Sequence, residues 1–292
     1  MNTMLKSMGV GAVALLTLVA AADESTVQIT FGDCRDCNPA VSPDGKHMAF
    51  ASDRTGPFNI YLLTFGESGV RQLTQSKKDD CRPSWSHNGK HIIFDSRRTG
   101  SGDLYEMAND GAAGFLQMTD RADRDEWPNY DITDTGLVFA TASVKGFSKV
   151  NPKMDVVYAQ VKGQANTARV LADGDEPKVS PDGKRVLFVS NRTKNKDLWI
   201  MGLDGGLQTQ LTTDPKDDTN PAFSPKGDQV VFASNRAGSF DLWVMNVDGS
   251  DVRQLTSTPE NETEPCWSVG GYIYYTRDAG ERKSSIYRIK AP

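Results

Sequence analysis

A short turn of the form Ser-x-x-Gly returns along the chain at nearly constant intervals, and this repeat limits the possible folds more than any other feature. Its last glycines stand 44 to 47 residues apart, and six copies of about 45 residues fill the chain after residue 22. The copies are Ser42-Pro43-Asp44-Gly45, Ser86-His87-Asn88-Gly89, the degenerate Asp134-Thr135-Gly136, Ser180-Pro181-Asp182-Gly183, Ser224-Pro225-Lys226-Gly227 and Ser268-Val269-Gly270-Gly271. A period of this length is typical of propellers and solenoids.

Each copy has the pattern of four short strands. In the fifth copy we predict strands over 221–224, 229–234, 241–246 and 252–256, separated by turns rich in Gly, Asp and Asn. No segment after residue 22 shows convincing helical periodicity. Four strands per copy and six copies predict an all-β fold, a six-bladed β-propeller of four-stranded blades.

The two ends of the chain predict how the ring closes. The sixth copy ends at Tyr287-Arg288-Ile289-Lys290, after its third strand. The missing strand resembles Val27-Gln28-Ile29-Thr30, which lies 44 residues before its counterpart Arg71-Gln72-Leu73-Thr74. We therefore expect the N-terminal strand to complete the last blade and hide a sheet edge.

Three motifs of these copies resemble the TolB-type, WD40-like propeller repeats of bacterial envelope proteins. They are Ser-Pro-Asp-Gly-Lys before an apolar strand, Ser-Asn-Arg as in Ser190-Asn191-Arg192 and Ser234-Asn235-Arg236, and Asp-Leu-Trp-x-Met-x-x-Asp-Gly as in 197–205 and 241–249. The resemblance covers the propeller only, without the α/β domain that precedes it in TolB. It implies a propeller that binds an envelope protein or peptide, although propellers serve many roles.

The N-terminus predicts export. Residues 1–22 carry one lysine, Lys6, an apolar run of 13 residues from Val10 and an Ala20-Ala21-Ala22 cleavage pattern, which together indicate a secretory signal peptide. Residues 23–292 would then form the propeller, periplasmic or secreted and with no stable membrane insertion after cleavage. An uncleaved anchor is the alternative. The formal net charge of −5 argues against a nucleic-acid partner.

A repeated acid stands three residues before the proline that opens each copy. Strand order places these loops on one face, around the mouth of the central channel. We predict a partner-binding site there, made of Asp36, Asp80, Asp125, Asp218, Glu262 and Glu126. The alternative is structural: each acid caps loop amides or pairs with Arg54, Arg98, Arg192, Arg236 or Arg277 from the same face. The fourth copy has Gly174 instead.

The third copy departs from the repeat in one long loop, 144–154. It carries Phe147 and Lys149 and would lie on the acidic face, where it either frames a partner or is a tolerated insertion. We include Phe147 and Lys149 in the predicted partner-binding site.

The four cysteines, Cys34, Cys37, Cys81 and Cys266, fall near the first blade. In an exported protein this favours a disulfide, with three possible pairings; free thiols and zinc are alternatives.

Motifs for catalysis are missing from the sequence. There is no Gly-x-Ser-x-Gly, no His-Glu-x-x-His and no phosphate loop, and the three histidines belong to the face opposite the acids. The pattern favours a non-catalytic protein-binding scaffold that needs no cofactor, with Ca²⁺ left open as a ligand of the acid ring. The alternative is a carbohydrate-active enzyme, a glycoside hydrolase or lyase that uses carboxylates at the channel mouth.

Overall fold

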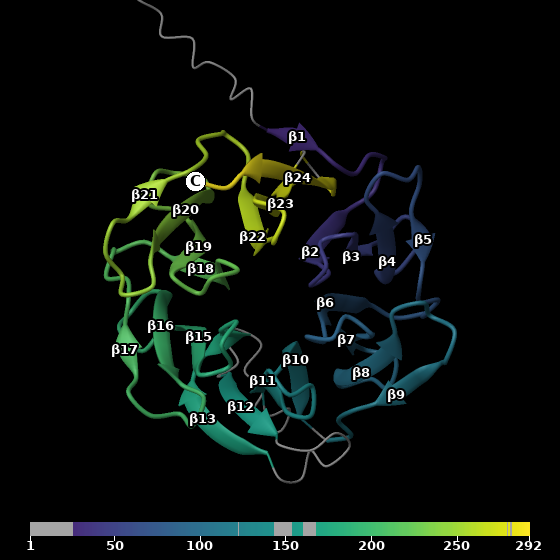
Figure 1. Ribbon diagram of the computed structural model, residues 1–292, viewed down its shortest axis with the longest axis horizontal. Coiled ribbons are helices and arrows are strands. Elements are labelled where there is room, and N and C mark those ends of the chain that lie inside the picture. Colours follow the sequence, from purple (N-terminus) through teal and green to yellow (C-terminus); the bar gives the residue numbers. More distant parts are fainter. Residues whose placement is uncertain (1–25, 122, 143–153, 160–167, 279, 281) are drawn as a thin grey trace, which may run out of the picture.

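The protein is a ring of six four-stranded antiparallel sheets (Figure 1). Residues of the first strand of each sheet line a central channel. The computed structural model describes residues 26–121, 123–142, 154–159, 168–278, 280 and 282–292. Within these ranges every regular element is a β-strand, so the predicted six-bladed propeller is confirmed. No helix in the described part of the chain is long and apolar enough to cross a membrane.

Every blade has the same strand order, from an innermost strand at the channel to a short outermost strand. The first three blades comprise β2 (Asp36–Val41), β3 (His47–Ser52), β4 (Asn59–Thr64) and β5 (Arg71–Gln72); β6 (Asp80–Trp85), β7 (His91–Ser96), β8 (Asp103–Ala108) and β9 (Phe115–Gln117); and β10 (Arg124–Tyr130), β11 (Leu137–Ala142), β12 (Asp155–Ala159) and β13 (Arg169–Asp173).

The last three blades repeat this arrangement. They comprise β14 (Asp175–Val179), β15 (Arg185–Ser190), β16 (Asp197–Gly202) and β17 (Thr209–Gln210); β18 (Asp218–Phe223), β19 (Gln229–Ser234), β20 (Asp241–Asn246) and β21 (Arg253–Gln254); and β22 (Glu262–Trp267), β23 (Tyr272–Asp278), β24 (Ser284–Lys290) and β1 (Val27–Gln28). In the fifth copy β19 and β20 match the predicted bounds, whereas β18 begins three residues earlier and β21 is shorter.

The first turn of each blade explains the Ser-Pro-Asp-Gly motif. In blade 1 the Ser42 hydroxyl donates to Asp44 at 2.6 Å and accepts the His47 amide at 2.9 Å. Gly45 has φ of 70°, a conformation that a side chain disfavours. The turn thus connects β2 to β3 with its polar groups satisfied locally, and the same Ser-to-Asp bond recurs at Ser180 and Asp182 at 2.5 Å.

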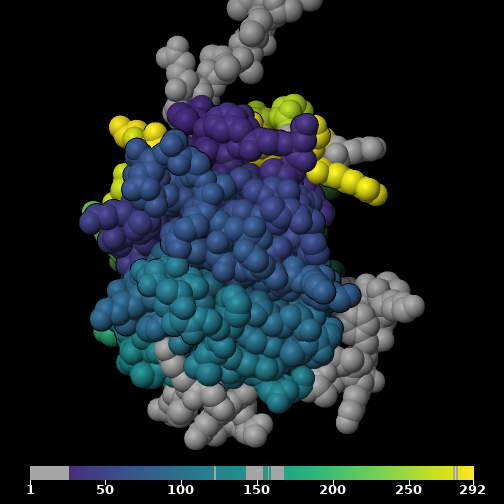
Figure 2. All heavy atoms as spheres, turned by 90° about the vertical axis from the view of Figure 1, so that its right-hand side faces the viewer, coloured from purple at the N-terminus to yellow at the C-terminus, as the bar shows by residue number. Residues whose placement is uncertain are grey.

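The N-terminal strand closes the ring, as predicted. β1 pairs antiparallel with β24, with Val27 opposite Arg288 and Gln28 opposite Tyr287. The Thr30 hydroxyl then accepts the Ile286 amide at 3.0 Å. N-terminal and C-terminal residues consequently lie side by side (Figures 1 and 2).

The core lies between neighbouring blades, where apolar residues of the second and third strands meet the next innermost strand. Between blades 1 and 2, for example, Ala51, Ile60 and Phe94 are fully buried around Trp85. Five further clusters repeat this arrangement at the other junctions of the described chain. The blades are therefore rigid supports for whatever the two ends of the channel present.

The signal peptide, the contacts of the long loop and the disulfide are three predictions that the described residues do not confirm. The signal peptide (1–22) and Phe147 and Lys149 in the long loop lie outside the described residues. The four cysteines are free thiols, so the structure shows no disulfide.

Candidate functional site

Five repeated acids stand at the start of the innermost strands, and they are buried. The exposed fraction is only 0 to 1% for all five: Asp36, Asp80, Asp125, Asp218 and Glu262. A carboxylate this deep needs a counter-charge or hydrogen bonds, because its desolvation is otherwise costly. We refer to these five residues as the acid ring.

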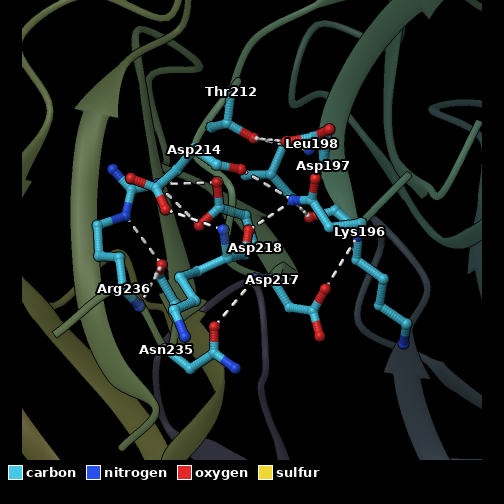
Figure 3. Close-up of polar contacts among 12 residues, drawn as sticks. Lys196, Asp197, Leu198, Thr212, Asp214, Asp217, Asp218, Asn235 and Arg236 are labelled. Atoms are coloured by element: carbon cyan, nitrogen blue, oxygen red, sulfur yellow. Dashed lines mark hydrogen bonds and ion pairs between the residues drawn. The ribbon is translucent and has the colours of Figure 1, made fainter. Parts of the chain in front are cut away.

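An arginine pairs with each member of the acid ring. Arg54 binds Asp36 at 2.8 Å, Arg98 binds Asp80 at 2.9 Å and Arg236 binds Asp218 at 2.7 Å. In blade 6 the Arg277 Nε reaches Glu262 at 2.8 Å. Figure 3 shows the blade 5 pair, in which the Arg236 side chain points towards Asp218. These contacts are the ones expected from the structural alternative, in which each acid pairs with an arginine from the same face.

The same arginines lie over an aromatic ring of the third strand. The guanidinium carbon is 4.9 Å from the Tyr61 centroid for Arg54, 4.8 Å from Trp243 for Arg236 and 4.3 Å from Tyr287 for Arg277. Their Nε groups in blades 1, 2, 4 and 5 also donate to the serine of the Ser-x-Arg motif. The Ser-Asn-Arg and Asp-Leu-Trp motifs are thus parts of one packing unit.

Blades 3 and 4 depart from this unit. In blade 3 the arginine is Arg121, four residues before Asp125 in the loop that enters the blade. In blade 4 Arg192 binds the main-chain oxygen of Asp173 at 2.7 Å, because Gly174 has no carboxylate. A Cβ on Gly174 would lie 2.5 Å from the oxygen of Val189, so this position has no room for an acid.

Neighbouring acids cap loop amides between blades. The Asp217 carboxylate accepts the Lys196 amide at 3.0 Å, and the Asp218 amide donates back to the Lys196 oxygen at 2.8 Å (Figure 3). Asp79 and Asp80 form the same pair of bonds with Phe58, at 3.1 and 2.9 Å. These acids therefore fix each blade to the next.

The acids that were predicted to form an open, negatively charged channel mouth are buried. The acid ring and Glu126, which is 5% exposed, are covered and neutralised by arginines, so they do not form an open negative funnel. The Glu126 carboxylate lies 3.5 Å from Arg82 and 3.3 Å from Arg124. The exposed charges of this face include Asp79, Arg97 and Lys196, whose side chains are 41, 50 and 46% exposed. We call these three residues the rim.

Two residues further along each innermost strand, the backbone turns into the channel. All six innermost strands shift register here, and all six residues have positive φ, between 49 and 57°. Each one precedes the proline that opens the repeat. We call these six positions the neck: Asn38, Arg82, Trp127, Glu176, Asn220 and Glu264.

Hydrogen bonds link neck residues of neighbouring blades at three junctions. The Asn38 amide donates to Glu264 of blade 6 at 2.8 Å, and the Asn220 amide donates to Glu176 of blade 4 at 2.5 Å. The Arg82 amide donates to the Asn38 side chain at 3.4 Å. A bulge leaves an amide without a ladder partner, and the preceding blade supplies the acceptor.

The charges of the neck lie close together in a narrow space of about 40 Å³. The Arg82 guanidinium bridges Asp95 at 3.1 Å and lies 4.6 Å from the Trp127 ring centroid. Burial and the adjacent Asp175 carboxylate raise the pKa of Glu176 to about 7. Burial also raises the pKa of Asp95 to about 6, against the effect of Arg82. Such shifts are frequent at functional sites.

The neck was not predicted as a site from the sequence. Its signal is present, because the residue before the repeat proline is Asn, Arg, Trp, Glu, Asn and Glu in successive copies. A position that varies where its neighbours repeat is free of the packing constraint. Metal ligation finds no support at the neck or elsewhere in the described residues, where no three His, Cys, Asp or Glu side chains gather.

The geometry defines a class of protein: a closed six-bladed propeller with a narrow polar neck in its channel. Within that class the chain belongs to the TolB β-propeller family, because the family model of the TolB beta propeller domain matches residues 12–174 and 145–291. No curated protein sequence matches the chain.

Solved structures described as TolB and as an oligogalacturonate lyase share the fold. A structure from Agrobacterium tumefaciens described as TolB has 18% identity and a TM-score of 0.67, covering 89% of this chain and 92% of that one. TolB from Acinetobacter baumannii has 15% identity and a TM-score of 0.66, covering 88% and 64%. Oligogalacturonate lyase from Vibrio parahaemolyticus has 15% identity and a TM-score of 0.64, covering 91% and 93%. At these identities the likeness concerns the fold alone.

Proposed function

We propose that this protein is a non-catalytic periplasmic scaffold that binds an envelope protein or peptide over the acid-ring end of its channel. The observation that carries the proposal is the contrast between the acid ring and the neck. The fold uses one acid–arginine unit in blade after blade, whereas the neck presents different side chains on the same backbone. Membership of the TolB β-propeller family supports a role in protein interactions.

Direct contacts in this proposal come from the rim. Arg97 lies 3.9 Å from Glu126, and Lys196 lies 3.9 Å from the neck residue Glu176, so the rim adjoins the channel opening. Mixed exposed charges favour a polar or charged partner and a salt-dependent association. The acid ring would serve the fold, by holding its arginines in place. Phe147 and Lys149 remain proposed contacts of the same face.

Partner capture from an envelope extract at low salt tests the proposal. We expect a partner that is retained by the wild-type protein and released as salt rises. A triple variant of the rim, Asp79→Ala with Arg97→Ala and Lys196→Ala, should lose that partner. Asp251→Ala with Arg253→Ala, an exposed pair at the outer edge of blade 5, is the matched control and should retain it. Equal capture by the folded rim variant would refute the proposal.

A carbohydrate-active enzyme is the second candidate, and Glu176 is the observation in its favour. A carboxyl group with a pKa near 7 suits general acid–base catalysis. The neck, however, has a volume of only about 40 Å³, and ligand pockets usually measure about 300 to 1,000 Å³. Product formation from oligogalacturonate or peptidoglycan fragments that disappears in Glu176→Gln would establish this candidate and displace the scaffold.

A further inference from the structure

The channel widens on the far side of the neck into a cavity with its own chemistry. Along β2 the chain passes from Asp36 through the neck residue Asn38 to Val41, and the wider space begins at Pro39. This cavity has a volume of about 420 Å³ and opens among the first turns of the blades, a size within the range of small-molecule pockets. We call it the vestibule.

The walls of the vestibule are mainly apolar. Trp85 and Phe223 are 9 and 8% exposed, and Trp267 and the first-turn residue Val269 line the same space. Six prolines from blades 1, 2, 4, 5 and 6 complete the wall: Pro39, Pro43, Pro83, Pro181, Pro225 and Pro265. Such a surface suits an apolar ligand body.

The charge of the vestibule has one sign. No Asp or Glu occurs among its described lining residues, in a chain that carries 38 acids. Lys178 stands at its inner end, because it lines both the vestibule and the neck. His87 is the other lining residue that can carry positive charge. An anionic group is therefore the complement of this lining.

The Lys178 ammonium has no hydrogen-bond acceptor among the described residues. Its charged neighbours include Glu176, Glu264 and Arg82 of the neck. Glu176 and Glu264 each use one carboxylate oxygen for the Asn220 and Asn38 amides. Glu264 also accepts the Thr276 hydroxyl at 2.8 Å. The ring centroid of Trp127 lies 5.9 Å from the ammonium. Lys178 can therefore donate to a ligand without breaking an existing hydrogen bond.

We infer that the vestibule is a binding site for a small apolar monocarboxylate, with Lys178 as the cation that receives the carboxylate. The ligand's apolar body contacts Trp85, Phe223 and Trp267. This site lies at the opposite end of the channel from the proposed partner surface and does not depend on it. No bond is made or broken, so the site binds and releases its ligand reversibly.

Calorimetric titration of the full protein with decanoate tests the inference, with decanol as the matched neutral probe. We expect saturable 1:1 binding of decanoate and at least 10-fold weaker binding of decanol. Lys178→Met should weaken decanoate binding about 10-fold or more, as expected for the loss of a charged hydrogen bond. Lys178→Arg should retain most of the affinity. Lys184→Met, an exposed lysine on the same face outside the lining, should bind like the wild type.

A second variant keeps the test decisive if Lys178→Met does not fold. Val269 is 59% exposed at the vestibule opening, so Val269→Asp adds a negative charge without emptying the core. It should weaken decanoate binding and leave decanol binding nearly unchanged. The inference is overturned if decanoate does not bind, or if both variants bind it as tightly as the wild type does. It is also overturned if only a peptide with a free C-terminal carboxylate binds, which would assign the vestibule to a chain terminus.

Discussion

The acid ring lies two residues before the neck on five of the six innermost strands, yet the side chains of the two groups follow different rules. The acid ring repeats one chemistry, is buried and pairs with arginines. The neck repeats only its backbone, with positive φ in all six blades and four kinds of side chain. The comparison teaches that repetition in this chain marks what the ring needs to fold, and that departures from it mark what a ligand can meet.

The largest effect should follow from removing a charge of the acid ring. Asp80→Asn leaves Arg98 without its counter-ion and is expected to lower the free energy of unfolding by about 3 kcal/mol. Asp79→Asn is the control one residue away: Asn keeps the oxygen that accepts the Phe58 amide, so the loss should stay below about 1 kcal/mol. Urea unfolding measures both. Similar losses in the two variants would remove the distinction between buried and rim acids.

At the neck the hydrogen bond should matter more than the charge. Glu264→Ala leaves the Asn38 amide and the Thr276 hydroxyl without an acceptor, and about 2 kcal/mol should be lost. Glu264→Gln keeps an acceptor oxygen and should cost less than about 1 kcal/mol. Thermal unfolding of the two variants separates the contributions. A glutamine variant as unstable as the alanine variant would mean that the neck requires its charge.

Glu176 should make stability depend on pH. Its pKa is raised in the folded protein to about 7, above the ordinary value of 4.5, so the folded state holds a proton that the unfolded state releases. The associated stability is present below about pH 4.5 and is lost as pH rises towards 7, by at most about 1.4 kcal/mol per pH unit. Glu176→Gln should flatten this slope in unfolding free energies measured at pH 5, 6 and 7. An unchanged slope would contradict the burial of an ionisable Glu176.

The closing blade should be held as firmly as the others, with a smaller effect per contact. Thr30 accepts the Ile286 amide at 3.0 Å, and Thr212 accepts the Leu198 amide at 3.0 Å in blade 4. Thr30→Val and Thr212→Val should each cost about 1 kcal/mol. Chemical unfolding compares them. A negligible effect for Thr30→Val alone would show that β1 contributes little to closure.

Much of the fold was predictable because the same pattern of strands and turns occurs in six copies. The turn glycines, the apolar second strands and the offset of Val27–Thr30 each follow from local patterns, and the structure confirms blades and closure. The fate of the acids was not predictable in the same way. The pairing of Asp125 with Arg121 and the contact of Arg192 with the Asp173 main chain depend on loop geometry that spacing does not encode.

The neck and the vestibule were harder still to predict. Positive φ before proline is unusual, since proline restricts the residue that precedes it, so the bulge at Asn38 and its five counterparts contradicts the local preference. Lys178 is an ordinary strand lysine in the sequence, and only the closed ring places it between the neck and an apolar cavity. Sites formed by several blades together emerge from closure, which no single repeat contains.

Partner capture by two variants, measured well below their unfolding temperatures, tests most directly whether repetition serves the fold and variation serves binding. Asp80→Asn removes a buried member of the acid ring, and the triple alanine variant of Asp79, Arg97 and Lys196 removes the rim. We predict that folded Asp80→Asn captures the partner as the wild type does, whereas the rim variant loses it. Loss of capture in Asp80→Asn with full capture by the rim variant would contradict the division of roles between the two regions.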